Sequence, residues 1–101
     1  MAFPRRKNAH ISGSADVGTS SDVIVERWDD RLELTIVNNS AADVSLKLQT
    51  SAQFKAGTDP TAVADEGVVL VSGGGSWTTT SYTGPIAAIA GSAVSVAVME
   101  I

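Results

Sequence analysis

The chain has 101 residues, which is room for one domain with a single hydrophobic core. It has no cysteine and one histidine, His10, so disulfide frameworks, thiolate zinc sites and sites built on several histidines are excluded, and we expect no enzyme, no cofactor and no metal. The abundance of 14 Ala, 12 Val, 12 Ser, 9 Thr and 9 Gly against 5 Leu favours strands and turns, which predicts an all-β chain.

The N-terminus carries the positive charge of the chain. Residues 1–10 have a net charge of +3, whereas residues 11–101 have a net charge of −7. No apolar period runs through residues 1–21, so we expect an extended arm there, and the lack of an apolar run behind the basic cluster predicts no secretory signal. A basic arm on an acidic body is suited to bind an acidic surface, although an inert solvated tail is the alternative. The candidate partner-binding residues are Phe3, Arg5, Arg6 and Lys7.

Strand patterns begin after the arm. Residues 23–28 are rich in β-branched and aromatic side chains and precede an Asp-Asp turn, which predicts a first strand. Residues 31–37 and 44–49 each alternate apolar with polar side chains, as half-buried strands do. The Asn-Asn-Ser segment between them tolerates a tight reversal, so we expect these two strands to form a hairpin.

The middle of the chain is predicted to contain a long connection and a second hairpin. Residues 51–66 show no sustained period, which is typical of a connection between sheets, with room for one helical turn after Pro60. Residues 67–72 form a short apolar run, and three glycines then turn the chain into the Thr-rich residues 76–82. We expect these two segments to pair.

The C-terminal segment, residues 85–99, is almost uncharged. It is too short and too rich in small side chains for a membrane span, so two buried strands are expected instead, at residues 86–90 and 93–101. The fold class predicted for residues 22–101 is thus a single seven-stranded antiparallel β-sandwich, Ig-like or jelly-roll-like. The predicted core contains Val23 or Ile24 together with Leu32, Leu34, Ile36, Val44, Leu46, Leu48, Leu70, Val94, Val96 and Val98.

The last strand predicts self-association. Its valines occupy one face, which leaves Ala93, Ala97 and Met99 on a nearly uncharged second face that a short chain cannot cover. A cyclic homo-oligomer, most simply a trimer, would bury that face. The acidic body is expected to repel phosphate backbones, so we expect no nucleic acid on the folded part, and no membrane.

Two groups of side chains have both a functional and a structural interpretation. The aromatic residues could form a sugar-stacking platform, although such residues in small sandwiches more often fill the core. Three acids in residues 51–66 could bind calcium, but their spacing does not match a calcium loop, and solvated charges are the default. The aromatic residues are Trp28, Trp77 and Tyr82, and the acids are Asp59, Asp65 and Glu66.

The C-terminal third carries a family resemblance. A glycine turn and Thr-rich strand at residues 73–80, an aromatic-Gly-Pro segment with small apolar residues at 82–90, and a Val-rich strand ending at Glu100 resemble small β-sandwich virion proteins of tailed bacteriophages. The resemblance implies a capsid decoration or head-stabilising role on the virion surface after synthesis in the host cytoplasm. It also implies the major capsid protein or other virion proteins as partners and no catalytic residues. A carbohydrate-binding or adhesive module, or another minor tail or scaffold component of the virion, are the alternatives.

Overall fold

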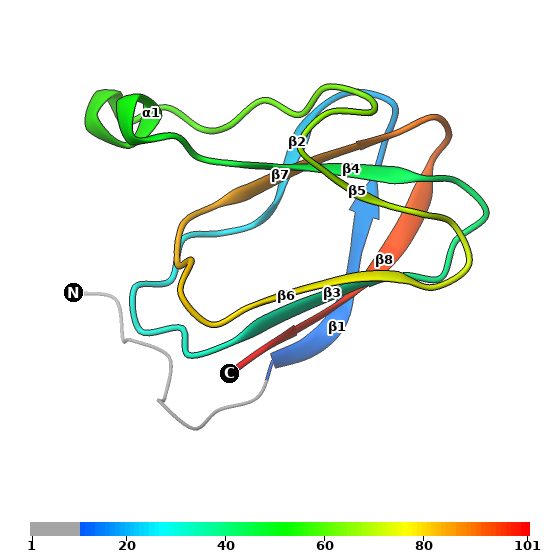
Figure 1. The fold of residues 1–101 in the computed structure, drawn as a ribbon, viewed down its shortest axis with the longest axis horizontal. Helices are drawn as coiled ribbons and strands as arrows, with labels where there is room; N and C mark the ends of the chain where they lie inside the picture. Colours follow the sequence, from blue (N-terminus) through cyan, green and yellow to red (C-terminus); the bar gives the residue numbers. More distant parts are fainter. Residues whose placement is uncertain (1–10) are drawn as a thin grey trace.

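Residues 11–101 form two β-sheets and one short helix in the computed structural model, which describes this part of the chain (Figure 1). The all-β class is confirmed, but there are eight strands rather than the predicted seven. Within the described residues no helix is long and apolar enough to cross a membrane. The elements are β1 (Ile11–Val17), β2 (Asp22–Val25), β3 (Leu34–Asn38), β4 (Val44–Leu48), α1 (Ser51–Ala56), β5 (Val68–Leu70), β6 (Gly75–Thr79), β7 (Ile86–Ala90) and β8 (Val94–Glu100).

The strands pair as one long hairpin that is wound into two layers. Strand β1 pairs with β8, β2 with β7, β3 with β6 and β4 with β5, all antiparallel, so the tip of this hairpin is the β4–β5 connection. Winding adds the pairs β3–β8 and β4–β7. The first sheet therefore has the order β1-β8-β3-β6, and the second sheet has the order β2-β7-β4-β5.

The core lies between the two sheets. The alternating patterns of β3 and β4 and the apolar faces of β5 and β8 supply the buried side chains as predicted, and four further predicted positions pack against them at the margin. Burial of these side chains is the main favourable term in the stability of the fold. The confirmed core residues are Leu34, Ile36, Val44, Leu46, Leu70 and Val96, with Ile24, Leu48, Val94 and Val98 partly buried.

Two predicted core positions are displaced by local irregularities. Leu32 is 58% exposed, because the amides of Leu32 and Glu33 both donate to the carbonyl oxygen of Ile101, at 2.7 and 3.3 Å. Leu32 and Glu33 thus both lie opposite Ile101, as in a β-bulge. The extra residue interrupts the alternation of the strand and turns the Leu32 side chain outward. In β2 the pairing register shifts between Val23 and Val25, so Val25 is the fully buried residue of this strand, while the predicted Ile24 packs partly buried against the core.

Both predicted hairpins are wrong. Strands β3 and β4 belong to different sheets, and so do β5 and β6. The buried side chain of Asn38, at the end of β3, explains the first crossing, since its Nδ2 donates to the carbonyl oxygens of Ala42 and Leu70 at 2.9 and 2.8 Å. Its Oδ1 accepts from the amide and the hydroxyl of Ser40. These hydrogen bonds pair polar groups of the connection that passes from one sheet to the other.

A strand lies within the segment that was predicted to be an extended arm. β1 pairs with β8 from Ile11, opposite Glu100, to Val17, opposite Val94, and the side chain of Val17 is 1% exposed. The prediction of an arm over residues 1–21 is therefore wrong from residue 11 onward. The reason is that β8 supplies the hydrogen-bonding partner for a strand whose own side chains are mostly small and polar.

The β4–β5 connection covers the outer side of the second sheet. It begins with α1, which lies before Pro60 and not after it as predicted, and then runs back along the sheet (Figure 1). Ala62 is buried, and the amide of Asp65 donates to the hydroxyl of Ser45 at 2.9 Å. Ser45 and Ala87 are consequently buried although they point away from the core. No segment among residues 11–101 covers the first sheet in this way.

The burial of Val17 distinguishes a paired strand at residues 11–17 from the extended, solvated arm predicted there. We expect Val17→Ala to lower the free energy of unfolding by about 2 kcal/mol, because it removes two buried carbon atoms and leaves a small void. The matched control Ser14→Ala, at an exposed position of the same strand, should change it by less than about 0.5 kcal/mol. Urea denaturation measures both values. Equal, negligible effects would mean that this segment is a solvated arm after all.

Candidate functional site

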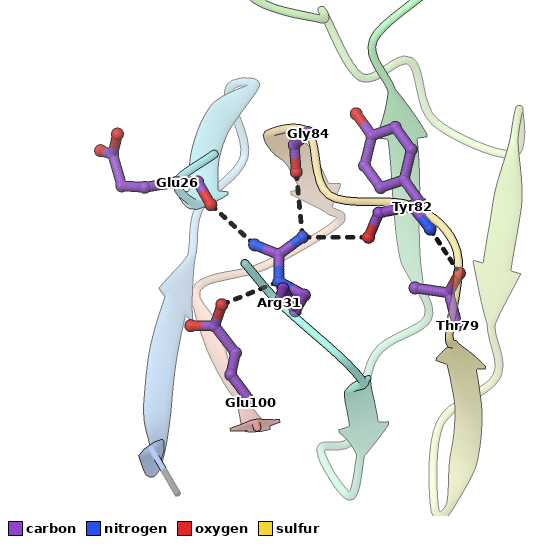
Figure 2. A network of polar contacts seen from close by, with 6 residues as sticks. All are labelled: Glu26, Arg31, Thr79, Tyr82, Gly84 and Glu100. Carbon is purple, nitrogen blue, oxygen red and sulfur yellow. Dashed lines mark hydrogen bonds and ion pairs between the residues drawn. The ribbon is translucent and has the colours of Figure 1, made fainter. Parts of the chain in front are cut away.

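Arg31 organises one end of the fold. Its buried guanidinium reaches four oxygen atoms from three separate segments (Figure 2). Nε donates to Oε2 of Glu100 at 2.9 Å, and the two residues are 5% and 6% exposed. Nη1 donates to the carbonyl oxygens of Tyr82 and Gly84 at 3.2 and 3.3 Å, and Nη2 donates to that of Glu26 at 2.7 Å. The C-terminal end of β8 is thereby fastened to the β2–β3 and β6–β7 connections.

The β6–β7 connection is also held from within. The amides of Ser81 and Tyr82 donate to Oγ1 of Thr79, at 3.3 and 3.1 Å. At Gly84 a Cβ atom would lie 2.6 Å from the hydroxyl oxygen of Tyr82, so the ring can approach the backbone this closely only because the residue is glycine. Internal bonds and the guanidinium of Arg31 together fix the position of the Tyr82 ring.

The hydroxyl of Tyr82 joins this connection to the end of β4. It accepts a hydrogen bond from the amide of Gln49 at 2.8 Å and donates to the carbonyl oxygen of Pro85. Burial raises the pKa of this phenol above its ordinary value of 10.0, since the phenolate is poorly solvated there. The hydrogen bond from Gln49 and the charges of Arg31 and Arg27 act in the opposite direction. The phenol is therefore neutral at physiological pH.

A cleft of about 360 Å³ lies next to Tyr82, between α1, the β6–β7 connection and the residues that follow β2. Arg27, Phe54 and Lys55 line it together with the Tyr82 ring and several hydroxyl groups. The guanidinium carbon of Arg27 lies 4.6 Å from the centroid of the Phe54 ring, which is the distance of a cation–π contact. The cleft therefore combines two cationic side chains, an aromatic ring and hydroxyls.

Capping interactions place α1 at the edge of the cleft. Thr50 accepts from the amide of Gln53, and the Gln53 side chain accepts from the amide of Thr50, which is a capping box. Gly57 ends the helix with a φ of 70°. None of the six residues of α1 is buried, and Phe54 is 56% exposed. The helix thus displays its aromatic ring to solvent.

The outer side of the first sheet is a second candidate surface, which we call the open face. Ala97 and Met99 of β8 lie on it, as predicted, and are exposed although β8 has a strand on either side. Asp16 is the one charged residue among its strand positions, and Glu33, which precedes β3 opposite Ile101, lies at its border. The open face consists of the outward residues Ser12, Ser14, Asp16, Thr35, Val37, Ser76, Thr78, Ser95, Ala97 and Met99.

The residues singled out in the sequence do not gather into one site. Phe3, Arg5, Arg6 and Lys7 lie outside the residues that the structure describes. The aromatic platform is not formed, because one tryptophan is buried in the β2–β3 connection, the other packs from β6 against the core, and the tyrosine hydroxyl is engaged as above. These three residues are Trp28, Trp77 and Tyr82. Within residues 11–101 no group of three or more acidic or histidine side chains could hold a metal ion, Asp59, Asp65 and Glu66 included.

Two features of the site, the start of α1 and the role of Arg31, are not predicted from the sequence, and a local signal exists only for the first. The spacing of Thr50 and Gln53 is that of a capping box, which marks the start of α1. Arg31 was assigned to the start of a strand, and nothing local distinguishes it from a solvated arginine. Comparisons of the chain with protein-family models, with curated proteins and with solved structures find no match.

The contacts of Arg31 predict a large effect of its removal. We expect Arg31→Ala to lower the free energy of unfolding by about 3–5 kcal/mol, because it takes the guanidinium away from a buried carboxylate and from three carbonyl oxygens. Arg31→Lys keeps the charge but lacks the planar fork, so its effect should fall between wild type and alanine. Chemical denaturation compares the three proteins. A loss for Arg31→Ala no larger than that of an exposed residue would contradict the structural role.

The raised pKa of Tyr82 predicts a loss of stability at alkaline pH. The folded state holds the phenol proton more tightly than the unfolded chain does, so this contribution to stability is complete below pH 10 and is lost as the pH rises through the folded-state pKa. Tyr82 is the one tyrosine of the chain, so phenolate absorbance titrates it alone. We expect a midpoint above 10.0 in native protein, and a weaker dependence of stability on pH above that value in Tyr82→Phe. A native midpoint at or below that of the urea-unfolded chain would refute this assignment.

Proposed function

We propose that the chain is a non-enzymatic structural protein of a virion, which decorates or stabilises a capsid as a homo-oligomer. The observation that carries the proposal is the open face. Its strand positions hold one charged side chain, Asp16, on a body whose residues 11–101 have a net charge of −7. Acidic surfaces of two copies repel each other, whereas two nearly uncharged faces can pack together at little electrostatic cost.

The type of the two-sheet fold fits this role. We assign it to the eight-stranded jelly roll, since the pairs β1–β8, β2–β7, β3–β6 and β4–β5 describe one long hairpin wound into two sheets. An Ig-like arrangement would pair several consecutive strands, and here β4–β5 is the one consecutive pair among the described strands. Jelly rolls serve in viral capsids, in lectins and in cupins, so the fold supports a virion role without selecting it.

The oligomer would bury the open face. Met99 lies on this face near the C-terminal end of β8, between β1 and β3, and is 51% exposed, so a large apolar side chain on a central strand is left in water. A closed cyclic assembly, most simply a trimer, removes such a face from water in every copy. Several copies in one assembly would also multiply weak contacts with the capsid.

The N-terminal residues supply the second contact in this proposal. Phe3 would be an apolar anchor, and Arg5, Arg6 and Lys7 would bind a carboxylate-rich patch on the major capsid protein or on another virion protein. Each exposed ion pair contributes about 0–1 kcal/mol, so attachment would need several copies and would weaken with salt. The resemblance of residues 73–100 to virion proteins of tailed bacteriophages supports the capsid surface as the location.

Sedimentation tests the proposal. We expect the protein to co-sediment with capsids from the lysate in which it is made, and the isolated protein to self-associate in light scattering. Ala97→Glu places a charge on the open face and should reduce both properties. Deletion of residues 2–10, which leaves β1 intact, should reduce only capsid occupancy, and more so as salt rises.

The matched control is Val69→Glu. Val69 is also an exposed apolar residue on a strand, but it belongs to β5 of the second sheet, so the same charge should leave self-association and occupancy unchanged. A protein that stays monomeric at every concentration and separates from capsids in a gradient would overturn the proposal. Equal effects of Ala97→Glu and Val69→Glu would show that the open face is not the surface through which the copies associate.

A further inference from the structure

Two of the four cationic side chains in residues 11–101 line the cleft beside α1. Of the four cationic side chains in residues 11–101, Arg31 is buried against Glu100, and Lys47 lies outside the cleft. The remaining two, Arg27 and Lys55, both line the cleft, and no carboxylate does. Arg27 pairs with Asp29 at 2.8 Å, whereas Lys55 has no ion pair within the described residues. This is a place where the chain attracts an anion.

The cleft also presents an aromatic ring that packing does not require. Phe54 is more than half exposed on a helix that buries none of its residues, so the ring does not stabilise the core. The face of an aromatic ring is negative and attracts positively polarised C–H groups. The guanidinium of Arg27 covers one face of Phe54, so a ligand with a C–H face, such as a pyranose ring, can stack on the other face.

The polar lining favours a polyhydroxylated ligand over a peptide. Ser51, Ser81 and Thr83 line the cleft, and their hydroxyls form no hydrogen bond within residues 11–101, so each hydroxyl that faces the cleft can donate to and accept from a ligand. The carbonyl oxygens of Tyr82 and Gly84 already accept from Arg31. The cleft therefore offers side-chain hydroxyls rather than the free backbone groups that bind an extended peptide.

We propose that this cleft binds an acidic sugar, a uronate residue whose carboxylate lies against Lys55 and Arg27 and whose ring stacks on Phe54. The volume of about 360 Å³ is at the small end of ligand sites and suits one or two sugar rings. Because the cleft is shallow and the ligand small, we expect a Kd of the order of 1 mM for a monosaccharide. The site shares no residue with the open face, so this proposal does not depend on the virion role.

An NMR titration of the full chain tests the site. Methyl glucuronide should shift the backbone amides of residues 50–55 and 81–84 with saturation, and the neutral methyl glucoside should bind several-fold more weakly. Lys55→Ala should weaken glucuronide binding about three- to fivefold, as an exposed ion pair does. Phe54→Ala should weaken it about fivefold through lost stacking. Both side chains are exposed, so the spectra of these variants should otherwise match wild type.

The matched control is Lys47→Ala, which removes the same charge from the body outside the cleft and should change the Kd by less than about 1.5-fold at physiological salt. An equal loss in Lys47→Ala and Lys55→Ala would show general charge attraction and overturn the site. Inorganic phosphate binding as tightly as glucuronide would make it a simple anion site, and tighter binding of an acidic peptide would make it a protein interface. The proposal would also be overturned if the amides showed no saturable shift at methyl glucuronide concentrations well above the expected Kd.

Discussion

The guanidinium of Arg31 joins the parts of the fold that the strand ladders leave separate. Hydrogen bonds between strands hold each sheet together, but the β2–β3 connection, the β6–β7 connection and the end of β8 meet beyond the ends of those ladders. A planar cation with five donors can satisfy a carboxylate and several carbonyl oxygens at once, which a lysine cannot. The desolvation cost of burying this charge is offset by four hydrogen bonds in one place.

The same interaction shapes the cleft. By holding the carbonyl oxygens of Tyr82 and Gly84, Arg31 fixes the wall of the cleft from behind and turns the backbone acceptors away from any ligand. The Tyr82 hydroxyl then fastens that wall to Gln49, directly before α1. The position of the cleft is thus set by the hydrogen bonds of Arg31 and Tyr82, while the side chains that line the cleft can bind a ligand. Rigid support behind an exposed set of polar groups lowers the ordering cost of binding.

Sequence patterns predicted which residues are buried much better than which strands are neighbours. Alternation identified Leu34 and Val44 because a period of two fixes the face on which a side chain lies. It contains no information on the pairing partner, so two sheet-crossing connections were interpreted as hairpins, and the role of Asn38 depends on contacts distant in sequence. β1 was missed because its order comes from pairing with β8 rather than from its own side chains. The cleft was missed because its residues come from three separate segments.

The two sheets differ in what covers their outer sides, and this difference separates the two proposed surfaces. The β4–β5 connection contributes α1 to the cleft and then buries the outer side of the second sheet, so that one segment both lines the proposed ligand site and completes one layer. Nothing among residues 11–101 does this for the first sheet, whose open face would be covered by another copy of the chain in the proposed oligomer. Because the cleft and the open face share no residue, a molecule whose open face is buried in an oligomer can still present the cleft to solvent. Assembly and ligand binding would then be compatible in the same particle, each supported by a different part of the wound hairpin.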